Sequence, residues 1–299
     1  MRGEDEPVVP TVTRHASRLI VGREYFIVRR RAQWARSRQL RFAQRHPVEL
    51  EHEQFRHSTP LIRKLKDVDM YLQYNKVTNL RLAIKRLDGV MLNPGETLSY
   101  WRLIGRPTKR RGYLTGMVLI NGTVGVGVGG GLCQLSNLIY WMTLHTPLSV
   151  VERHRHGYDV FPDAERTLPF GSGATCFYNY GDLVIRNDTS RPFQLKLELT
   201  AEELVGQWTS SSAAELTYEV YEKRHLIRSE NWGGYTRHNV LHRRSYTAGG
   251  GLLSDDYVTQ NHAIMMYPPL LSDAPSAARE GVTQPLDQRW EIRLGRCRR

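Results

Sequence analysis

A cysteine that closely follows three glycines has the residue types that acyl transfer requires. The run Gly129-Gly130-Gly131 leads through Leu132 to Cys133. Glycine lets the backbone bend sharply and lets a substrate approach closely. The residues after Leu132 have helical apolar spacing, so we expect Cys133 at a helix N-terminus, where the helix dipole favours a thiolate. The free N–H groups at such a terminus also stabilise an oxyanion. One short element would therefore supply both a nucleophile and its electrophilic support.

The same element has a structural interpretation, in which Cys133 is a buried helix-start residue beside glycines that permit close packing. A phosphate-binding loop is disfavoured, because no Gly-Lys-Ser/Thr follows the glycines and their spacing does not match a dinucleotide fingerprint. We therefore expect no cofactor.

The run Glu152-Arg153-His154-Arg155-His156 contains two alternating histidines. On a strand both would face one side, and either could take the proton from Cys133. Core or surface histidines are the alternative. A zinc site of Cys133, His154 and His156 is chemically possible, but the spacing offers no fourth ligand, so we predict no metal.

Asp182 follows Gly181 at the start of an expected strand and could orient a histidine. An aspartate after a glycine more often caps a turn, and this interpretation stays open.

The elements around these residues can be predicted from apolar periodicity and turn residues. Residues 18–45 contain the apolar positions of a basic helix. Pro60 opens a helical segment, and Asn75 is expected to cap a second helix that Gly89 ends. Asn121-Gly122 predicts a hairpin between residues 114–120 and 123–128, before a helix over residues 132–144.

Further strands are expected at residues 175–180, 183–186, 193–199 and 216–222. The expected helices and strands are segregated along the chain and do not alternate as βαβ units. The sequence therefore predicts an α+β fold, mainly antiparallel, with N-terminal helices and a helix after the glycine-rich hairpin.

The chain is strongly basic at both ends. Its 299 residues include 42 Lys and Arg against 30 Asp and Glu, a net charge of +12. Residues 14–45 contain ten arginines and one acid. We divide the chain into an Arg-rich leader (1–57), a domain (58–271) and a polar basic tail (272–299). The leader is either a solvated surface or a contact with an anionic surface.

The expected location is the cytoplasm. The N-terminus is polar and has no signal-peptide pattern, and no run approaches the roughly 20 apolar residues of a membrane span. Cys133, Cys176 and Cys297 lie far apart without Cys-x-x-Cys spacing, which fits a reducing compartment.

From about residue 60 to about residue 270 the sequence resembles the VanW family, named for an accessory protein of VanB-type vancomycin resistance clusters. The matching stretches are Asn75-Lys76-Val77-Thr78-Asn79-Leu80, Pro94-Gly95-Glu96-Thr97-Leu98-Ser99, Gly129-Gly130-Gly131-Leu132-Cys133-Gln134-Leu135-Ser136, Glu152-Arg153-His154-Arg155-His156 and Gly181-Asp182-Leu183.

The resemblance implies a function. Some exported members look like cysteine-dependent transpeptidases that form L,D-type cross-links in peptidoglycan, which would make Cys133 the nucleophile and His154, or else His156, the base. A wider set of residues would bind or position the substrate: Glu96, Ser99, Gly129, Gly130, Gly131, Gln134, Ser136 and Asp182. The expected function is acyl transfer on a cell-wall peptide or precursor through a thioester. The alternative is a non-catalytic protein that binds such a peptide.

Overall fold

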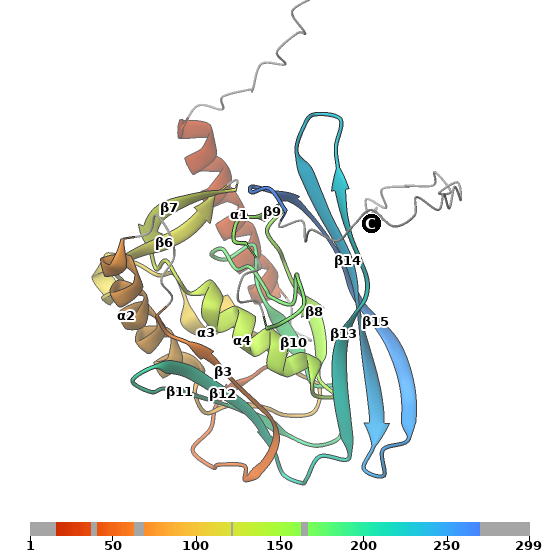
Figure 1. Ribbon diagram of the computed structural model, residues 1–299. Coiled ribbons are helices and arrows are strands. Elements are labelled where there is room, and N and C mark those ends of the chain that lie inside the picture. Colours follow the sequence, from red (N-terminus) through yellow and green to blue (C-terminus); the bar gives the residue numbers. More distant parts are fainter. Residues whose placement is uncertain (1–15, 37–40, 63–68, 121, 163–166, 270–299) are drawn as a thin grey trace, which may run out of the picture. The chain divides into compact units, whose positions relative to one another are not determined.

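The computed structural model describes residues 16–36, 41–62, 69–120, 122–162 and 167–269 (Figure 1). The predicted tail at 272–299, with Cys297, lies outside these ranges, as do the first 15 residues. The helices are α1 (Ala16–Arg36), α2 (Met70–Leu87), α3 (Tyr100–Ile104) and α4 (Cys133–Leu144), with a 3₁₀ turn at Lys109–Arg111.

The described strands form three larger sheets and one hairpin. The first sheet has the order β1 (Arg41–Phe42), β5 (Glu96–Ser99), β10 (Val184–Arg186), β8 (Ser149–Glu152). The second has the order β2 (Gln44–Arg45), β4 (Val90–Leu92), β11 (Phe193–Leu199), β12 (Glu203–Ser210), β3 (His52–Pro60). The third has the order β13 (Leu216–Ser229), β14 (Tyr235–Thr247), β15 (Leu252–Met265), β9 (Tyr158–Asp159). The hairpin joins β6 (Thr115–Ile120) to β7 (Thr123–Val128).

These elements confirm the predicted α+β class. Most strand pairs are antiparallel, and β1–β5 and β9–β15 pair in parallel. Helix α4 is the centre of the core: it packs against β3, β8 and β12, and its apolar side chains are buried on nearly all sides. Trp208 of β12 is fully buried, and its indole N–H donates to Thr143 Oγ1 of α4 at 3.2 Å.

Several local predictions are confirmed. The hairpin turns at Gly122 with φ +80°, and Gly89 takes φ +77° just after α2 ends. The expected helix over residues 132–144 is α4, and the alternating pattern over 193–199 is β11.

Other expectations were wrong. Asn75 lies inside α2 instead of capping a helix, and its Nδ2 donates to Thr115 O at 2.8 Å. Pro60 ends β3, which pairs with β12, and the two residues after it are not helical. Residues 63–68 of the expected helical segment lie outside the described ranges. Helix α1 ends at Arg36, and two short strands follow it.

The predicted strand at residues 175–180 is also absent from the described chain there. Phe177 and Gly181 exchange backbone hydrogen bonds of 2.9 and 3.1 Å, which closes a tight turn. Thr175 makes one isolated bridge with His154. The β-forming residue types are present, but the chain reverses before a ladder can form.

Candidate functional site

Cys133 is the first residue of α4, as the sequence predicted. The residue is partly exposed, while its sulfur is buried and donates to the carbonyl oxygen of Cys176 at 3.6 Å. This burial raises the pKa of Cys133 above that of an ordinary thiol. The helix terminus alone led us to expect a stabilised thiolate, but desolvation outweighs it, and the resting group at neutral pH is the thiol.

The turn before α4 leaves a run of amides unpaired. The N–H groups of Gln134 and Leu135 donate to the carbonyls of Gly131 and Leu132, each at 3.1 Å. In the described part of the chain, the N–H groups of Gly131, Leu132 and Cys133 have no acceptor. Three consecutive free donors at a helix start can bind an anionic oxygen.

The glycines are required for packing. A Cβ on Gly130 would overlap the carbonyl group of Gly116 in the hairpin. Gly131 has φ +89°, and a Cβ there would collide with the side chain of Lys76 on α2. The carbonyl of Gly130 also accepts from Asn79 Nδ2 at 3.0 Å. The run therefore joins the hairpin, α2 and α4 at close range. Gly129 has φ +79°, and its Cβ would meet Pro107, in the loop after α3, at 2.7 Å.

Gln134 and Ser136 fix the first turn of α4. The Gln134 amide donates to Thr59 Oγ1 and Pro60 O, both at 2.9 Å. Ser136 Oγ donates to Ala174 O at 2.6 Å. The polar groups of both side chains are thus engaged with the protein itself, which makes them positioning residues.

A polar network at the end of β8 centres on Glu152. Its carboxylate accepts two hydrogen bonds from Arg30 of α1, at 2.7 and 2.6 Å, and lies 2.9 Å from His154 Nε2. The backbone N–H of Asp182 donates to it at 3.2 Å. Burial alone would raise the pKa of Glu152, but the hydrogen bonds from His154 and Arg30 lower it to about 2.

Asp182 is buried beside this network. Ser99 Oγ donates to its Oδ2 at 2.5 Å, and the N–H groups of Trp101 and Leu183 donate to its Oδ1 at 2.9 Å. Burial nevertheless raises the pKa of Asp182 to about 7. Asp182 therefore accepts a hydrogen bond from the first turn of α3, and its backbone N–H supports Glu152, while the carboxylate that contacts a histidine is Glu152.

The two histidines occupy different surroundings. Both lie beyond Glu152, where β8 ends, so strand alternation does not align them. Burial lowers the pKa of His156. Among the described residues, neither imidazole hydrogen-bonds Cys133. The carboxylate of Glu96 makes no hydrogen bond or ion pair with this network among the described residues; it closes a turn by accepting from Asn93 N at 2.8 Å.

One short segment, residues 175–177, nevertheless contacts both Cys133 and His154. The Cys133 thiol contacts the carbonyl of Cys176, and the N–H of the adjacent Thr175 donates to His154 O at 2.9 Å. The next residue, Phe177, packs its ring 5.6 Å from the His154 ring. The structure thus brings Cys133, His154, Glu152 and Asp182 to one region of the fold.

Sequence reasoning missed Glu152 and Arg30. Glu152 had a signal, since it stands two residues before His154 in a quoted motif. Arg30 had none, because 122 residues separate it from Glu152.

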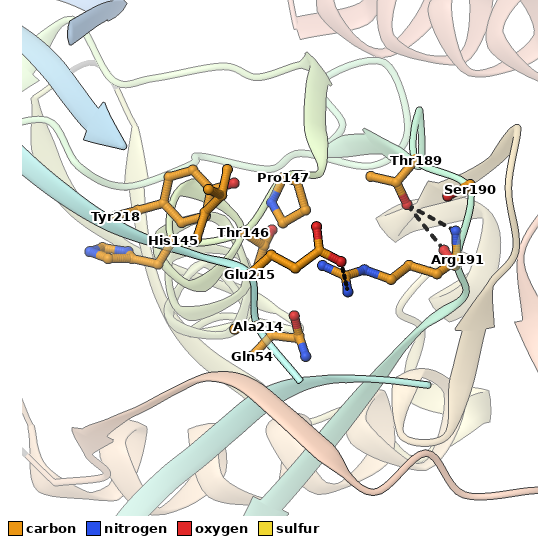
Figure 2. Close-up of a pocket in the computed structure, with 11 residues that line it drawn as sticks. Gln54, His145, Thr146, Pro147, Thr189, Ser190, Arg191, Ala214, Glu215 and Tyr218 are labelled. Carbon is orange, nitrogen blue, oxygen red and sulfur yellow. Dashed lines mark hydrogen bonds and ion pairs between the residues drawn. The ribbon is translucent and has the colours of Figure 1, made fainter. Parts of the chain in front are cut away.

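Two surface pockets lie elsewhere. The pocket in Figure 2, of about 160 Å³, is lined by residues that include His145, Tyr218 and the ion pair of Arg191 with Glu215, at 3.0 Å. The second borders Gly89 and Lys196. In the described ranges, no group of three or more His, Cys, Asp or Glu could hold a metal ion, and no helix there is long and apolar enough to span a membrane.

Comparison with known proteins gives three matches. The family model described as "VanW like protein" matches residues 75–209. The Vancomycin B-type resistance protein VanW of Enterococcus faecalis is 34% identical over 200 residues, which cover 67% of this chain and 73% of that protein. The Uncharacterized protein YoaR of Bacillus subtilis is 28% identical over 118 residues, 40% of this chain and 37% of that protein. No solved structure matches.

Proposed function

The chain belongs to the VanW family, which is linked to vancomycin resistance, and on this premise we propose that it is a cysteine-dependent acyl transferase acting on cell-wall-type peptides. The observation that carries the proposal is the run of three unpaired N–H groups that ends at Cys133 itself. A nucleophile and the donors for an oxyanion then belong to one element, as acyl transfer requires.

The proposed reaction has two balanced steps. Cys133 Sγ attacks a peptide carbonyl carbon, the S–C bond forms, the amide C–N bond breaks, and the thiol proton passes to the leaving amine. An acceptor amine then attacks the thioester, its proton returns to sulfur, and the thiol is regenerated. In both steps the carbonyl oxygen carries negative charge, which the N–H groups of Gly131, Leu132 and Cys133 would stabilise.

His154 is the proposed proton carrier, in preference to His156. Glu152 accepts a hydrogen bond from its imidazole at 2.9 Å when Nε2 carries the proton, which can fix the orientation of the ring. The raised pKa of Cys133 means that the thiol must be deprotonated during the reaction, so a base is needed.

The substrate class is proposed from the family link, since vancomycin resistance is a property of the cell wall. The cytoplasmic location stays a prediction, and it would restrict the acyl donor to wall precursors.

The test is adduct formation. The protein is incubated with synthetic stem peptides and with amine acceptors, and its intact mass is followed. We expect a thioester adduct that is absent from Cys133→Ala and retained in Cys176→Ala, which removes the neighbouring thiol. Absence of adduct and of turnover in the folded wild type would reject the enzymatic proposal.

A non-catalytic peptide-binding role is the second candidate. The raised pKa of Cys133 and the hydrogen bond from its thiol to Cys176 O favour this role, because both are typical of a packed, unreactive thiol. It predicts that stem peptides bind equally well to wild type and to Cys133→Ala, with no adduct in either.

A further inference from the structure

Helix α1 lies outside the family-matched segment and has two different faces. One face is attached to the rest of the domain. Ile27 is 2% exposed, Arg30 pairs with Glu152, and Glu24 accepts from Arg106 at 2.6 and 3.1 Å. The helix is therefore held in a defined rotation about its own axis.

The opposite face carries large apolar side chains that are exposed, and among the described residues the ring of Tyr25 contacts only that of its neighbour Phe26. Val21, Tyr25 and Val28 are 68%, 61% and 62% exposed. At 3.6 residues per turn, these positions fall within about 60° of one another. They form an outward apolar stripe, which we call the α1 stripe.

A row of arginines borders the α1 stripe. Arg18, Arg29 and Arg36 are exposed, and among the described residues none of them pairs with a carboxylate. Their spacing of 11 and 7 residues places them within about 20° of one another, next to Tyr25. The stripe therefore has a cationic edge.

We propose that α1 is an interfacial helix that docks the protein on an anionic phospholipid surface. The α1 stripe enters the boundary between headgroups and acyl chains, and Arg18, Arg29 and Arg36 contact lipid phosphates. An apolar stripe with a basic flank supplies the two signals that stable peripheral binding needs. The anchored face keeps the stripe outward, so the rest of the domain need not unfold to bind.

The apolar stripe favours lipid over nucleic acid as the occupant. Nucleic-acid binding needs arginines and polar groups, but gains little from valines placed between them. A bilayer surface uses both features at once.

The experiment is vesicle co-sedimentation of the full chain. Vesicles of phosphatidylcholine alone are compared with vesicles that also contain phosphatidylglycerol. We expect binding only to the anionic vesicles, weakened by salt. The variant Arg18→Gln/Arg29→Gln/Arg36→Gln should bind about a hundredfold more weakly, since each basic residue near an anionic leaflet contributes roughly fivefold. Val21→Ser/Tyr25→Ser/Val28→Ser should lose about tenfold or more.

A matched control removes equally exposed apolar side chains elsewhere. Leu252 and Leu253 of β15 are 58% and 57% exposed, and Leu252→Ser/Leu253→Ser should bind like wild type. Arg56→Gln/Arg110→Gln/Arg224→Gln serves as the charge control. Circular dichroism establishes that each variant is folded.

Five outcomes would overturn the proposal, and four of them come from the binding assays. These are no binding to anionic vesicles, equal binding to neutral ones, equal losses in the control variants, and retention on DNA without vesicle binding. A fifth is conversion of a dimer to a monomer by the stripe variant, without lipid, because a second copy would then cover the stripe.

Discussion

Ser99 Oγ donates a 2.5 Å hydrogen bond to Oδ2 of Asp182, so a hydroxyl and a buried carboxyl group meet where β5 ends and α3 begins. Both residues are almost fully buried, at 1% and 0% exposure. A carboxyl group in such a place prefers its neutral form, which gives the fold a titration near neutral pH.

This burial predicts a pH dependence of stability. Because the pKa of Asp182 is raised to about 7 from 3.8, the folded state binds more protons than the unfolded state between these values. Its contribution to the free energy of unfolding is therefore full below about pH 4, and is lost as pH rises to about 7, by at most about 4 kcal/mol. Asp182→Asn should remove this dependence in denaturation measured across that range.

The control for this experiment is Asp256→Asn, on the exposed part of β15. It should keep the wild-type pH profile. If wild type and Asp182→Asn show parallel profiles between pH 4 and pH 7, Asp182 does not titrate as inferred.

Replacing Arg30 should destabilise the fold. The Arg30 and Glu152 side chains are only 18% and 23% exposed, so Arg30→Gln leaves a partly buried carboxylate without its cation. We expect a cost of about 2 kcal/mol in chemical denaturation. Arg106→Gln breaks the more exposed pair of the same helix, with Glu24, at 36% and 41% exposure, and should cost clearly less than Arg30→Gln. Equal costs would contradict the burial argument.

The same pair governs acid sensitivity. The pKa of Glu152 is lowered to about 2 from 4.5, so its contribution to stability is present above pH 4.5 and is lost as pH falls towards 2. In Arg30→Gln that pKa should rise, and acid unfolding should begin at higher pH than in wild type. An unchanged acid midpoint would show that Arg30 does not hold the carboxylate ionised.

Alkylation of Cys133 should be slow at neutral pH. Burial raises its pKa, and the reactive thiolate forms only as pH rises through that value. Iodoacetamide kinetics are measured across pH, with each cysteine followed by peptide mass mapping. The alkylation rate of Cys133 should reach half its maximum at a higher pH than that of a free cysteine peptide. Cys176→Ala removes the adjacent thiol and should leave the profile in place. If Cys133 reaches its half-maximal alkylation rate at a lower pH than the peptide, the fold stabilises the thiolate.

Gly130→Ala should be strongly destabilising. Its Cβ would overlap the carbonyl of Gly116. Neither backbone can move alone, because Gly116 pairs with Gly127 in the hairpin and the N–H of Gly130 donates to Gly127 O at 3.1 Å. We expect about 2–3 kcal/mol. Gly125→Ala, on β7, is the matched control, because its nearest neighbour would be Ile120 at an ordinary 3.5 Å. It should change stability by less than about 1 kcal/mol. A neutral Gly130→Ala would contradict the close approach.

Local patterns predicted the parts of the fold that local physics determines. Asn121-Gly122 marks a hairpin because its turn needs positive φ, and Gly122 has it. The alternation of Leu195 and Leu197 with polar residues marks β11, since one face of that strand is more buried than the other. The start of α4 at Cys133 follows from the glycines before it and the apolar spacing after it.

Tertiary contacts explain the failures. Asn75 has the residue type of a cap, but it lies inside α2 because its amide finds a partner in β6. The long strands β14 and β15 have weak local patterns and exist through pairing with each other. The raised pKa of Cys133 comes from its burial in the folded chain, which no spacing near residue 133 reveals.

The crowded oxygen of Glu152 has an evolutionary consequence. Oε1 accepts from Arg30, from the backbone N–H of Asp182, and from His154 when its Nε2 carries the proton. A substitution at one of these side chains leaves the others with unmatched charge or an unmatched donor. Among relatives, positions 30, 152 and 154 should therefore change together, so that lineages without a cation on the N-terminal helix also lack this acid and imidazole.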